Sequence, residues 1–584
     1  MSRGSRSRTS VANVLVIGSG AAGLRCAIAA HQAGVEVVVI GKSAANDAHT
    51  VLAAGGINAA LGTVDPEDSW QQHFADTLKE GYFLSDPRVV EITTREAPEA
   101  IRELADWGCP FARTAGGALD QRFFGAHRYR RTCFAGDYTG RAILGTLAAK
   151  VGELGILMAE NQYVSRLLIG DGQCFGALAF DVMTGDRTVF LADAVVLAAG
   201  GHTRIWRKSS SRRDENNGDG IYLALQAGCR VADMELVQFH PTGMVAPEEL
   251  AGTLVTEAVR GEGGRLINSR GERFMERYDA ERMELSTRDR VALANYIEIA
   301  EGRGGPNGGV FLDITHRSKD FILERLPRMY RQFIEYQMLD ISREPMEVAP
   351  TAHYSMGGVA VEPETHATSV PGLYAAGEVT AGLHGANRLG GNSLTETVVF
   401  GRRAGEAAAA FALERDVALR SRSTVAEAHD DLSSFIHDGA EFARPLQRAL
   451  RNAMWEGCGV VRSQETLEHG LATVAELKGA VGDIDVRPSS EGFGDLAHVL
   501  DLRASLTAAE ASLLGALARR ETRGAHIRSD HPELDPSLCV NFNVVADEGG
   551  RLSVGSEPVP PVPDHLAGWA ADSSEVEVPG RLLE

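Results

Sequence analysis

The chain has 584 residues, enough for about two to four domains and a large core. Its formal net charge of -21 argues against a nucleic-acid-binding protein, although a local basic pocket could still receive a small anion. No apolar run approaches the roughly 18 residues that a membrane span requires. Seven scattered cysteines without a CxxC pair argue against a zinc or iron–sulfur site within this chain, and they are typical of reduced thiols in a cytoplasmic protein.

The first ten residues are basic and polar, with the sequence MSRGSRSRTS. They lack the small-residue cleavage site of a signal peptide. We therefore predict that residues 1–10 form a disordered extension of a cytoplasmic protein.

A glycine-rich turn lies between the first predicted strand, residues 11–17, and the first predicted helix, residues 21–33. Gly18, Gly20 and Gly23 form the motif GxGxxG in the order strand, turn and helix. Free amides at the N-terminus of such a helix can bind a pyrophosphate. The turn therefore predicts a dinucleotide site.

The second predicted strand, residues 35–40, ends differently from the usual dinucleotide motif. That motif places an acidic residue here to bind a ribose, whereas this chain has Gly41 and Lys42. The difference argues against plain NAD and favours FAD, with Lys42 among the cofactor-binding residues.

Small residues and glycines continue soon after this strand, a composition that allows backbone to approach a cofactor closely. His49 and Thr50 precede Gly55 and Gly56 there. In this pattern the sequence resembles the flavoprotein subunits of succinate dehydrogenase and fumarate reductase, a family with L-aspartate oxidase as a close relative. In the respiratory members the corresponding histidine carries FAD covalently, and aspartate oxidases generally lack it. The resemblance therefore implies FAD, with His49 as the candidate for covalent attachment, although Ala54 departs from the glutamine often found there.

Further segments resemble the FAD contacts of this family. Glu378 ends a predicted strand and would contact the ribitol or ribose, and Asp219 opens a helix and would lie by the flavin. Ser393 and Leu394 would reach the isoalloxazine ring. The helix predicted for residues 395–411 would direct its N-terminus at the flavin C2 oxygen.

The segment LHGANRLGGNSL, residues 383–394, places an arginine beside two glycines. In order with four other motifs, at residues 239–243, 256–264, 286–289 and 352–358, it resembles the dicarboxylate site of the family. The match extends from about residue 12 to residue 405, with a weaker one to about residue 532. A C4 dicarboxylate has two anionic ends, and both must be held for a C–H bond to face the flavin. The residues implied to bind these ends are His240, Thr256, His353 and Arg388.

The resemblance also implies a proton carrier, Arg288, supplied through Glu257 and Arg260. An arginine is normally always protonated, but neighbouring cations lower its pKa, and an acid in fumarate reduction needs only to donate transiently. The spacing of three between Glu257 and Arg260 places both on one face of a helix. The alternative for Arg288 is a structural ion pair with Asp289.

These observations predict an α/β fold: a Rossmann-like FAD-binding domain with an inserted α+β capping domain and a C-terminal helical domain. The FAD-binding domain would comprise residues 11–240 and 351–412, and the capping domain residues 241–350. Helices are predicted at residues 425–436, 446–460, 463–477 and 506–521, within a helical domain of residues 420–535. Thr507 and Glu510 form a plausible capping box for the last of them. Residues 536–584 would be an extended tail, and no metal site is expected.

The leading hypothesis is an FAD-dependent enzyme that interconverts succinate and fumarate by hydride transfer at flavin N5. The resemblance implies that electrons pass through an iron–sulfur subunit to a quinone, and that membrane anchor subunits hold the complex at the cytoplasmic face of the membrane. The main alternative is L-aspartate oxidase, which converts aspartate to iminoaspartate, and residues 311–350 lean towards it. A third hypothesis, a flavin-bearing binding protein without turnover, is disfavoured by the complete set of dicarboxylate residues.

Overall fold

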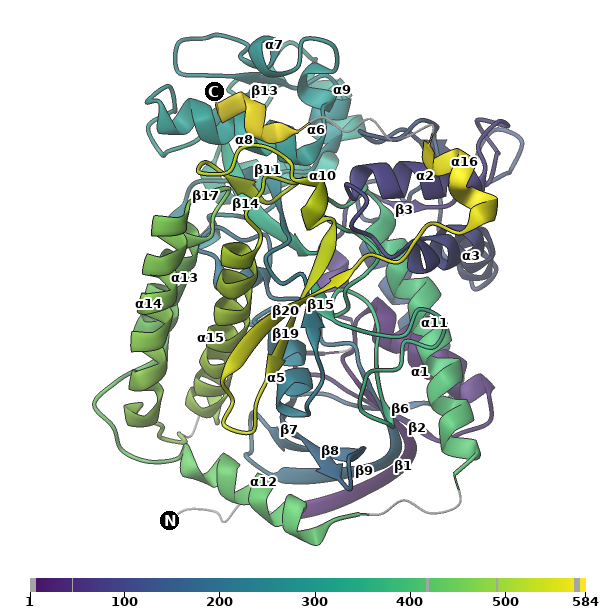
Figure 1. Ribbon diagram of the computed structural model, residues 1–584. Coiled ribbons are helices and arrows are strands. Elements are labelled where there is room, and N and C mark those ends of the chain that lie inside the picture. The colour runs from purple at the N-terminus through teal and green to yellow at the C-terminus, as the bar shows by residue number, and fades with distance from the viewer. Residues whose placement is uncertain (1–6, 45, 416–419, 490–491, 572–577, 584) are drawn as a thin grey trace.

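The computed structural model describes residues 7–44, 46–415, 420–489, 492–571 and 578–583. Figure 1 shows a main sheet towards the bottom, a smaller capping region at the top and a bundle of helices along one side. The arrangement confirms the predicted fold class, an α/β Rossmann-like domain with a capping domain and a C-terminal helical domain.

The main sheet has seven strands, and its central part is parallel. In sheet order the strands are β6 (Leu157–Ala159), β2 (Val37–Ile40), β1 (Ser7–Ile17), β9 (Arg187–Leu197), β8 (Gln173–Asp181) and β7 (Gln162–Gly170), while β16 (Leu373–Ala375) also pairs with β9. All pairs from β6 to β9 and β16 are parallel, whereas β8 and β7 are antiparallel. The parallel strands direct their carboxyl ends to one edge, where doubly wound folds bind ligands.

The N-terminal segment differs from the prediction. Strand β1 begins at Ser7, and residues 7–10 pair in register with residues 187–190 of β9. The predicted disorder is therefore wrong for residues 7–10, because ladder hydrogen bonds order a segment whose polar side chains gave no strand signal. The rest of the predicted extension, residues 1–6, lies outside the described residues.

Two helices pack closely beside the parallel strands. Helix α1 (Ala21–Gln32) contacts α11 (Asn392–Leu413), which begins three residues before the predicted start at residue 395. A Cβ atom on Gly401 would lie 2.6 Å from the carbonyl oxygen of Ala22, so only glycine permits this approach of the two helices. Both helices begin at the carboxyl edge of the sheet.

The capping region has a four-stranded antiparallel sheet of its own. In sheet order its strands are β11 (Val237–Met244), β14 (Met346–Ser355), β13 (Val310–Asp313) and β12 (Arg265–Ile267). Its helices are α6 (Ala258–Gly261), α7 (Met275–Tyr278), α8 (Arg288–Ala300), α9 (Lys319–Arg325) and α10 (Pro327–Gln337). Buried apolar residues such as Phe274, Leu312 and Phe333 form a separate core here, so the region is a compact platform above the main sheet.

The C-terminal part begins with four helices: α12 (Arg422–Ser434), α13 (Ala443–Gly457), α14 (Gln464–Ala480) and α15 (Gly494–Ala518). Helices α13, α14 and α15 stand side by side on the left of Figure 1. The predicted start of the last helix at residue 506 is wrong, and so is the capping box. Thr507 lies inside α15, and its hydroxyl donates to the carbonyl of Arg503 at 3.0 Å.

The predicted extended tail is also corrected. Strands β19 (Val540–Ala546) and β20 (Leu552–Pro558) form a hairpin, and β19 extends a small sheet made by β10 (Val231–Ala232) and β15 (Gly358–Val359). Further on, α16 (Ala567–Ala571) packs against α2 (Trp70–Glu80), and η8 (Pro579–Leu583) contacts α8. The hairpin orders because its apolar side chains, such as Val544, are buried against the earlier domain.

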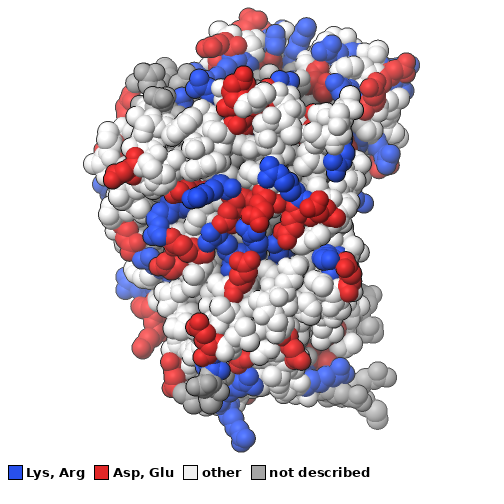
Figure 2. All heavy atoms as spheres, turned by 90° about the vertical axis from the view of Figure 1, so that its right-hand side faces the viewer, with Lys and Arg blue, Asp and Glu red and all other residues white. Residues whose placement is uncertain are grey.

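The face on the right of Figure 1 carries interleaved acidic and basic side chains (Figure 2). On this side, α3 (Pro87–Asp106) and α11 are joined by an ion pair between Glu96 and Arg402 at 2.9 Å. Acidic side chains on this face therefore lie beside basic ones, so the net negative charge of the chain does not form a purely acidic surface here. Within the part of the chain that the structure describes, no helix has both the length and the apolar character that crossing a membrane requires.

Candidate active site

A large cavity opens where the carboxyl edge of the main sheet, the capping sheet and the N-termini of α1 and α11 meet. Its empty volume, which includes the space of its open mouth, is about 1820 Å³. Every predicted site residue lines it except Gly23 and Arg260, which lie behind its wall. The structure thus gathers around one cavity residues that the sequence spreads from position 18 to position 394.

The glycine turn has the shape that a bound pyrophosphate needs. A Cβ atom on Gly18 would lie 2.1 Å from the carbonyl oxygen of Ala198, and one on Gly23 would lie 1.9 Å from that of Gly18. Gly20, the N-cap of α1, has no side-chain cap, and the first turn of α1 contains no acidic residue. Backbone amides and the helix dipole therefore face the cavity without a competing carboxylate, which fits a phosphorylated cofactor.

His49 and Thr50 begin the short helix η1 (His49–Leu52) at the cavity wall. The Thr50 hydroxyl accepts a hydrogen bond from the amide of Ala21 at 3.1 Å, so it steadies the start of α1. His49 Nδ1 lies 3.1 Å from Glu215 Oε2. Burial alone would lower the pKa of His49, but the hydrogen bond and the charge of Glu215 raise it. This contact uses Nδ1, so Nε2 is the ring nitrogen that remains for another bond.

Lys42 gathers two carboxylates at the end of β2. Its Nζ atom lies 2.6 Å from Asp219 Oδ2 and 3.0 Å from Asp501 Oδ1. Burial alone would lower the pKa of Lys42, but these two charges raise it. Asp219, the first residue of α5 (Asp219–Gln226), therefore brings a carboxylate to the place where the classical motif has an acidic residue for the ribose. This position favours a ribose contact for Asp219 over the flavin contact that the resemblance implied.

Glu378 is held at the cavity wall by two hydrogen bonds. Its Oε1 accepts from the amide of Ser355 at 3.0 Å, and its Oε2 accepts from Asn216 Nδ2 at 3.3 Å. Burial raises the pKa of Glu378. Ser393 and Leu394, in the first turn of α11, line the same cavity.

The four predicted dicarboxylate ligands come from separate parts of the chain. His240 lies on β11, His353 on β14 and Thr256 just before α6, and their side chains meet Arg388 at the cavity. The rings of His240 and His353 are 5.2 Å apart between centroids. Burial lowers the pKa of both histidines well below the usual range, so both are neutral hydrogen-bond donors. Positive charge for an anionic ligand therefore comes from the arginines.

Three charged side chains lead from the capping region to the cavity: Arg260, Glu257 and Arg288. Glu257 Oε2 lies 3.7 Å from Arg260 Nη2 and 2.9 Å from Arg288 Nη2. Burial alone would raise the pKa of Glu257, but Arg288 and Arg260 lower it to about 2. The alternative pair of Arg288 with Asp289 is replaced by this arrangement, because Asp289 Oδ2 instead accepts a hydrogen bond from the Tyr82 hydroxyl at 2.8 Å.

Gln238 joins the two cavity arginines, and sequence reasoning missed it. Its Oε1 accepts from Arg288 Nη1 and from Arg388 Nη2, both at 3.0 Å. Its Nε2 donates to Asn387 Oδ1 at 2.8 Å and to the carbonyl of Arg388 at 2.9 Å. Two acceptors around Nε2 fix the orientation of this fully buried amide. The signal was available, because Gln238 precedes His240 by two residues and alternate residues of a strand share a face.

Two further residues had no sequence signal. The hydroxyl of Ser210 lies 2.8 Å from Nδ1 of His353, so this contact orients the imidazole ring. Asp501 reaches Lys42 from α15. Both partners are more than 100 residues away in the chain, and only the fold brings them together.

Two family profiles match the chain. One, described as "FAD binding domain", matches residues 13–394. The other, described as "Fumarate reductase flavoprotein C-term", matches residues 447–562. Together they cover the cavity and most of the C-terminal part.

Curated relatives and solved structures agree with these matches. A protein of Methanothermobacter marburgensis that is named as a subunit of fumarate reductase (CoM/CoB) is 45% identical, over 90% of this chain and 95% of that protein. A succinate dehydrogenase flavoprotein subunit of Rickettsia conorii is 36% identical, over 94% of this chain and 95% of that protein. The structure of Mycobacterium smegmatis Sdh1 in complex with UQ1 superposes with a TM-score of 0.86 at 40% identity, covering 95% of each chain.

Proposed function

Since the chain belongs to the family of succinate dehydrogenase and fumarate reductase flavoprotein subunits, we propose that it interconverts succinate and fumarate in the cavity described above. The family are oxidoreductases that bind FAD, and the glycine turn, the uncapped start of α1 and the start of α11 fit that cofactor. When bound, FAD supplies the acceptor or donor of a hydride through N5 of its ring. In the proposal Gly18, Gly20 and Asp219 hold its phosphates and ribose.

The substrate carboxylates are bound at two ends. Arg388 supplies the buried positive charge for one end, and its Nε atom has no hydrogen-bond partner among the described residues. His240, His353 and Thr256 supply neutral donors. Ser210 orients the ring of His353 through Nδ1, and in the proposal the ring hydrogen lies on Nε2, where it can be donated to a carboxylate. Fixing both ends orients the central carbon atoms and removes the entropy of alignment from the reaction.

Arg288 transfers the proton in this proposal. It lines the cavity together with Glu257 and Arg388, whereas Arg260, the third residue of the Arg260–Glu257–Arg288 series, does not. The ionised Glu257 carboxylate accepts from Arg288 Nε and Nη2, so a proton that it receives from Arg260 can pass on to Arg288 after each turnover. Arg260 lies behind and connects the series to the interior of the capping region.

We propose that electrons pass from this chain through an iron–sulfur subunit to a quinone at a membrane anchor on the cytoplasmic face of the membrane, or in the reverse direction. The support lies in the relatives, which are named as subunits, and in the Mycobacterium smegmatis protein, whose structure contains UQ1. The name of the Methanothermobacter marburgensis relative contains CoM/CoB instead. The electron partner of this chain must therefore be identified by an experiment separate from the one that identifies its substrate.

The observation that carries the proposal is the convergence of Arg388, His240 and His353 with Arg288 around one cavity. The test is turnover by the purified, FAD-loaded chain with succinate and with L-aspartate, against one artificial electron acceptor that bypasses partner proteins. We expect oxidation of succinate and none of L-aspartate. Aspartate oxidation with peroxide formation in air would overturn the proposal in favour of L-aspartate oxidase.

We also propose that FAD is attached covalently at His49. Replacing His49 with serine is expected to leave no flavin on the acid-denatured chain, whereas the unaltered chain retains its flavin fluorescence under the same conditions. Replacement of His316, an exposed histidine of the capping region, serves as the matched control. Flavin that dissociates from the unaltered denatured chain would contradict covalent attachment.

A further inference from the structure

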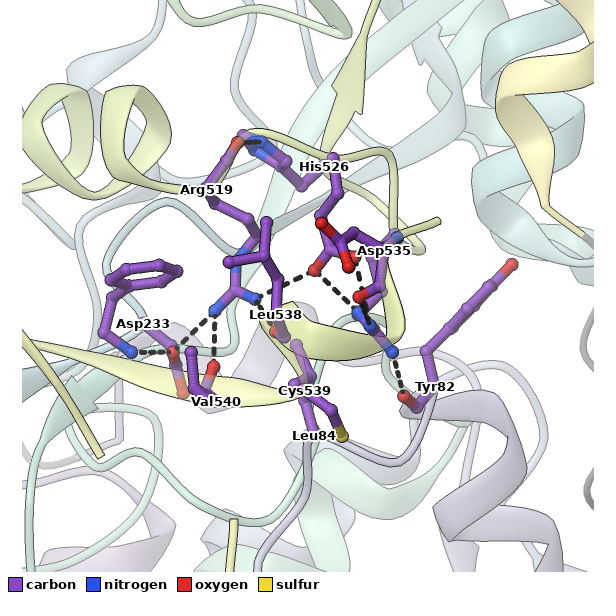
Figure 3. Close-up of polar contacts among 12 residues, drawn as sticks. Tyr82, Leu84, Asp233, Arg519, His526, Asp535, Leu538, Cys539 and Val540 are labelled. Atoms are coloured by element: carbon purple, nitrogen blue, oxygen red, sulfur yellow. Dashed lines mark hydrogen bonds and ion pairs between the residues drawn. The ribbon is translucent and has the colours of Figure 1, made fainter. Parts of the chain in front are cut away.

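The turn after α2 is held from outside by the C-terminal part of the chain. Three successive carbonyls of this turn accept hydrogen bonds from C-terminal side chains, and Figure 3 shows the one at Tyr82. The pairs are Tyr82 O with Arg523 Nη1 at 3.0 Å, Phe83 O with Cys539 Sγ at 3.5 Å, and Leu84 O with Asn541 Nδ2 at 3.1 Å. The C-terminal part therefore fixes the backbone of the turn residue by residue.

The turn needs this support because its backbone is strained. Tyr82 and Phe83 have φ values of 53° and 59°, in the left-handed region where a Cβ atom crowds the backbone. Two consecutive residues other than glycine persist in this conformation only when the surrounding structure determines it. The conformation of the turn therefore fixes the direction in which the Tyr82 side chain leaves the backbone.

The support is itself rigid. Arg523 donates from Nε and Nη2 to the two oxygens of Glu521, at 2.8 Å and 3.0 Å, and from Nη2 to the carbonyl of Asp535 at 3.0 Å. Arg519 shares Glu521 with it and is anchored in turn by Glu235 at 2.8 Å. Arg519, Glu521 and Arg523 are all at most 3% exposed.

The Tyr82 hydroxyl connects the supported turn to the capping region through a hydrogen bond. It donates to Asp289 Oδ2 at 2.8 Å, and both residues are buried. Burial, followed by the charge of Asp289, raises the pKa of Tyr82 well above its usual range, so the hydroxyl keeps its proton. Asp289 directly follows Arg288 in the first turn of α8, so this contact holds the backbone from which the Arg288 side chain extends.

We propose that Tyr82 is a positioning residue for Arg288, and that the C-terminal cluster of Arg519, Glu521 and Arg523 presets its direction. The inference rests on the proposed role of Arg288 as the proton donor to fumarate. Glu257 and Gln238 hold the guanidinium group itself, whereas Tyr82 and Asp289 hold the helix start beneath it. The two sets together fix the donor relative to a bound dicarboxylate.

Replacing Tyr82 with phenylalanine tests the proposal in the FAD-loaded chain. We expect kcat for fumarate reduction to fall about ten-fold, the scale of one hydrogen bond to a charged group, with KM and flavin content unchanged. Amide hydrogen exchange in residues 287–293 is expected to become faster. Asn541→Ala, which removes the donor to Leu84, is a second variant and should lower kcat several-fold in the same way.

Tyr278→Phe is the matched control, because the Tyr278 hydroxyl donates to Glu298 at 2.7 Å elsewhere in the capping region. The proposal is overturned if Tyr82→Phe retains the kcat of this control, even when exchange in α8 is faster, because Tyr82 would then be structural only. A chain that turns over neither succinate nor fumarate before substitution would instead refute the proposed function. In that case unchanged exchange in Tyr82→Phe would still refute the contact between Tyr82 and the start of α8.

Discussion

Replacing Arg288 with lysine is expected to lower kcat for fumarate reduction by about 10²–10⁴-fold, the usual contribution of a general acid, while KM changes little. Lysine keeps the positive charge, so attraction of a dicarboxylate persists. It cannot, however, direct Nε and Nη2 at Glu257 and Nη1 at Gln238 at the same time, as the guanidinium does. Steady-state kinetics with a reduced artificial electron donor measure kcat and KM, and the flavin absorbance of the same samples gives the concentration of FAD-loaded chain.

The control for this variant is Arg270→Lys, which alters an exposed arginine of the capping region. It should leave kcat unchanged. If Arg288→Lys behaves in the same way, then Arg288 is not the acid and its ion pair with Glu257 is structural.

The pH dependence gives a second check on the same pair. The pKa of Glu257 is lowered to about 2 in the folded chain, whereas an unperturbed glutamate titrates at about 4.3. The stability that this carboxylate contributes is therefore complete above the unfolded pKa and is lost only as pH falls through the folded pKa. Glu257 therefore stays ionised between pH 8 and pH 5, and its protonation should cause no loss of kcat in this range. A loss of kcat with a midpoint near pH 4.3 would contradict the ion pair between Glu257 and Arg288.

The parts of the site that sequence could predict are those written as local motifs. Gly18, Gly20 and Gly23 identify themselves through their spacing between a strand and a helix, and the structure gives Gly18 and Gly23 a steric reason. The dicarboxylate motifs, of which Arg388 is the last in the chain, indicated a shared site through their resemblance to those of the family. In these cases the backbone within a few residues determines what the side chain does.

The parts that sequence could not predict depend on distant partners. Ser210 reaches His353, and Asp501 reaches Lys42, only because separate domains pack together. The capping box at Thr507 failed for the opposite reason, since a correct local pattern lies inside a longer helix whose tertiary packing continues through it. The hairpin of β19 and β20 is likewise ordered by burial of side chains such as Val544 against the earlier domain, and its local sequence alone did not predict this.

Replacing Gln238 with leucine is expected to lower kcat/KM for fumarate by about 10²–10³-fold while FAD binding is preserved. The substitution removes the shared acceptor of Arg288 and Arg388 and leaves both donors buried. Each unpaired buried polar group costs about 1–3 kcal/mol, and each 1.36 kcal/mol corresponds to about ten-fold in rate. Steady-state kinetics of fumarate reduction and the flavin content of the purified variant provide the measurement.

Gln238→Glu separates the positions of the two arginines from their charge. A carboxylate still accepts from both arginines but neutralises part of the positive charge that attracts a dicarboxylate, so KM should rise more than kcat falls. Gln447→Leu is the matched control, because Gln447 is also buried and donates to Ser505 at 3.1 Å within the helical bundle. It should lower stability without changing kcat/KM. A Gln238→Leu variant with the kcat/KM of this control would show that the arginines keep their geometry without the shared amide, because Glu257 alone would then suffice to place Arg288.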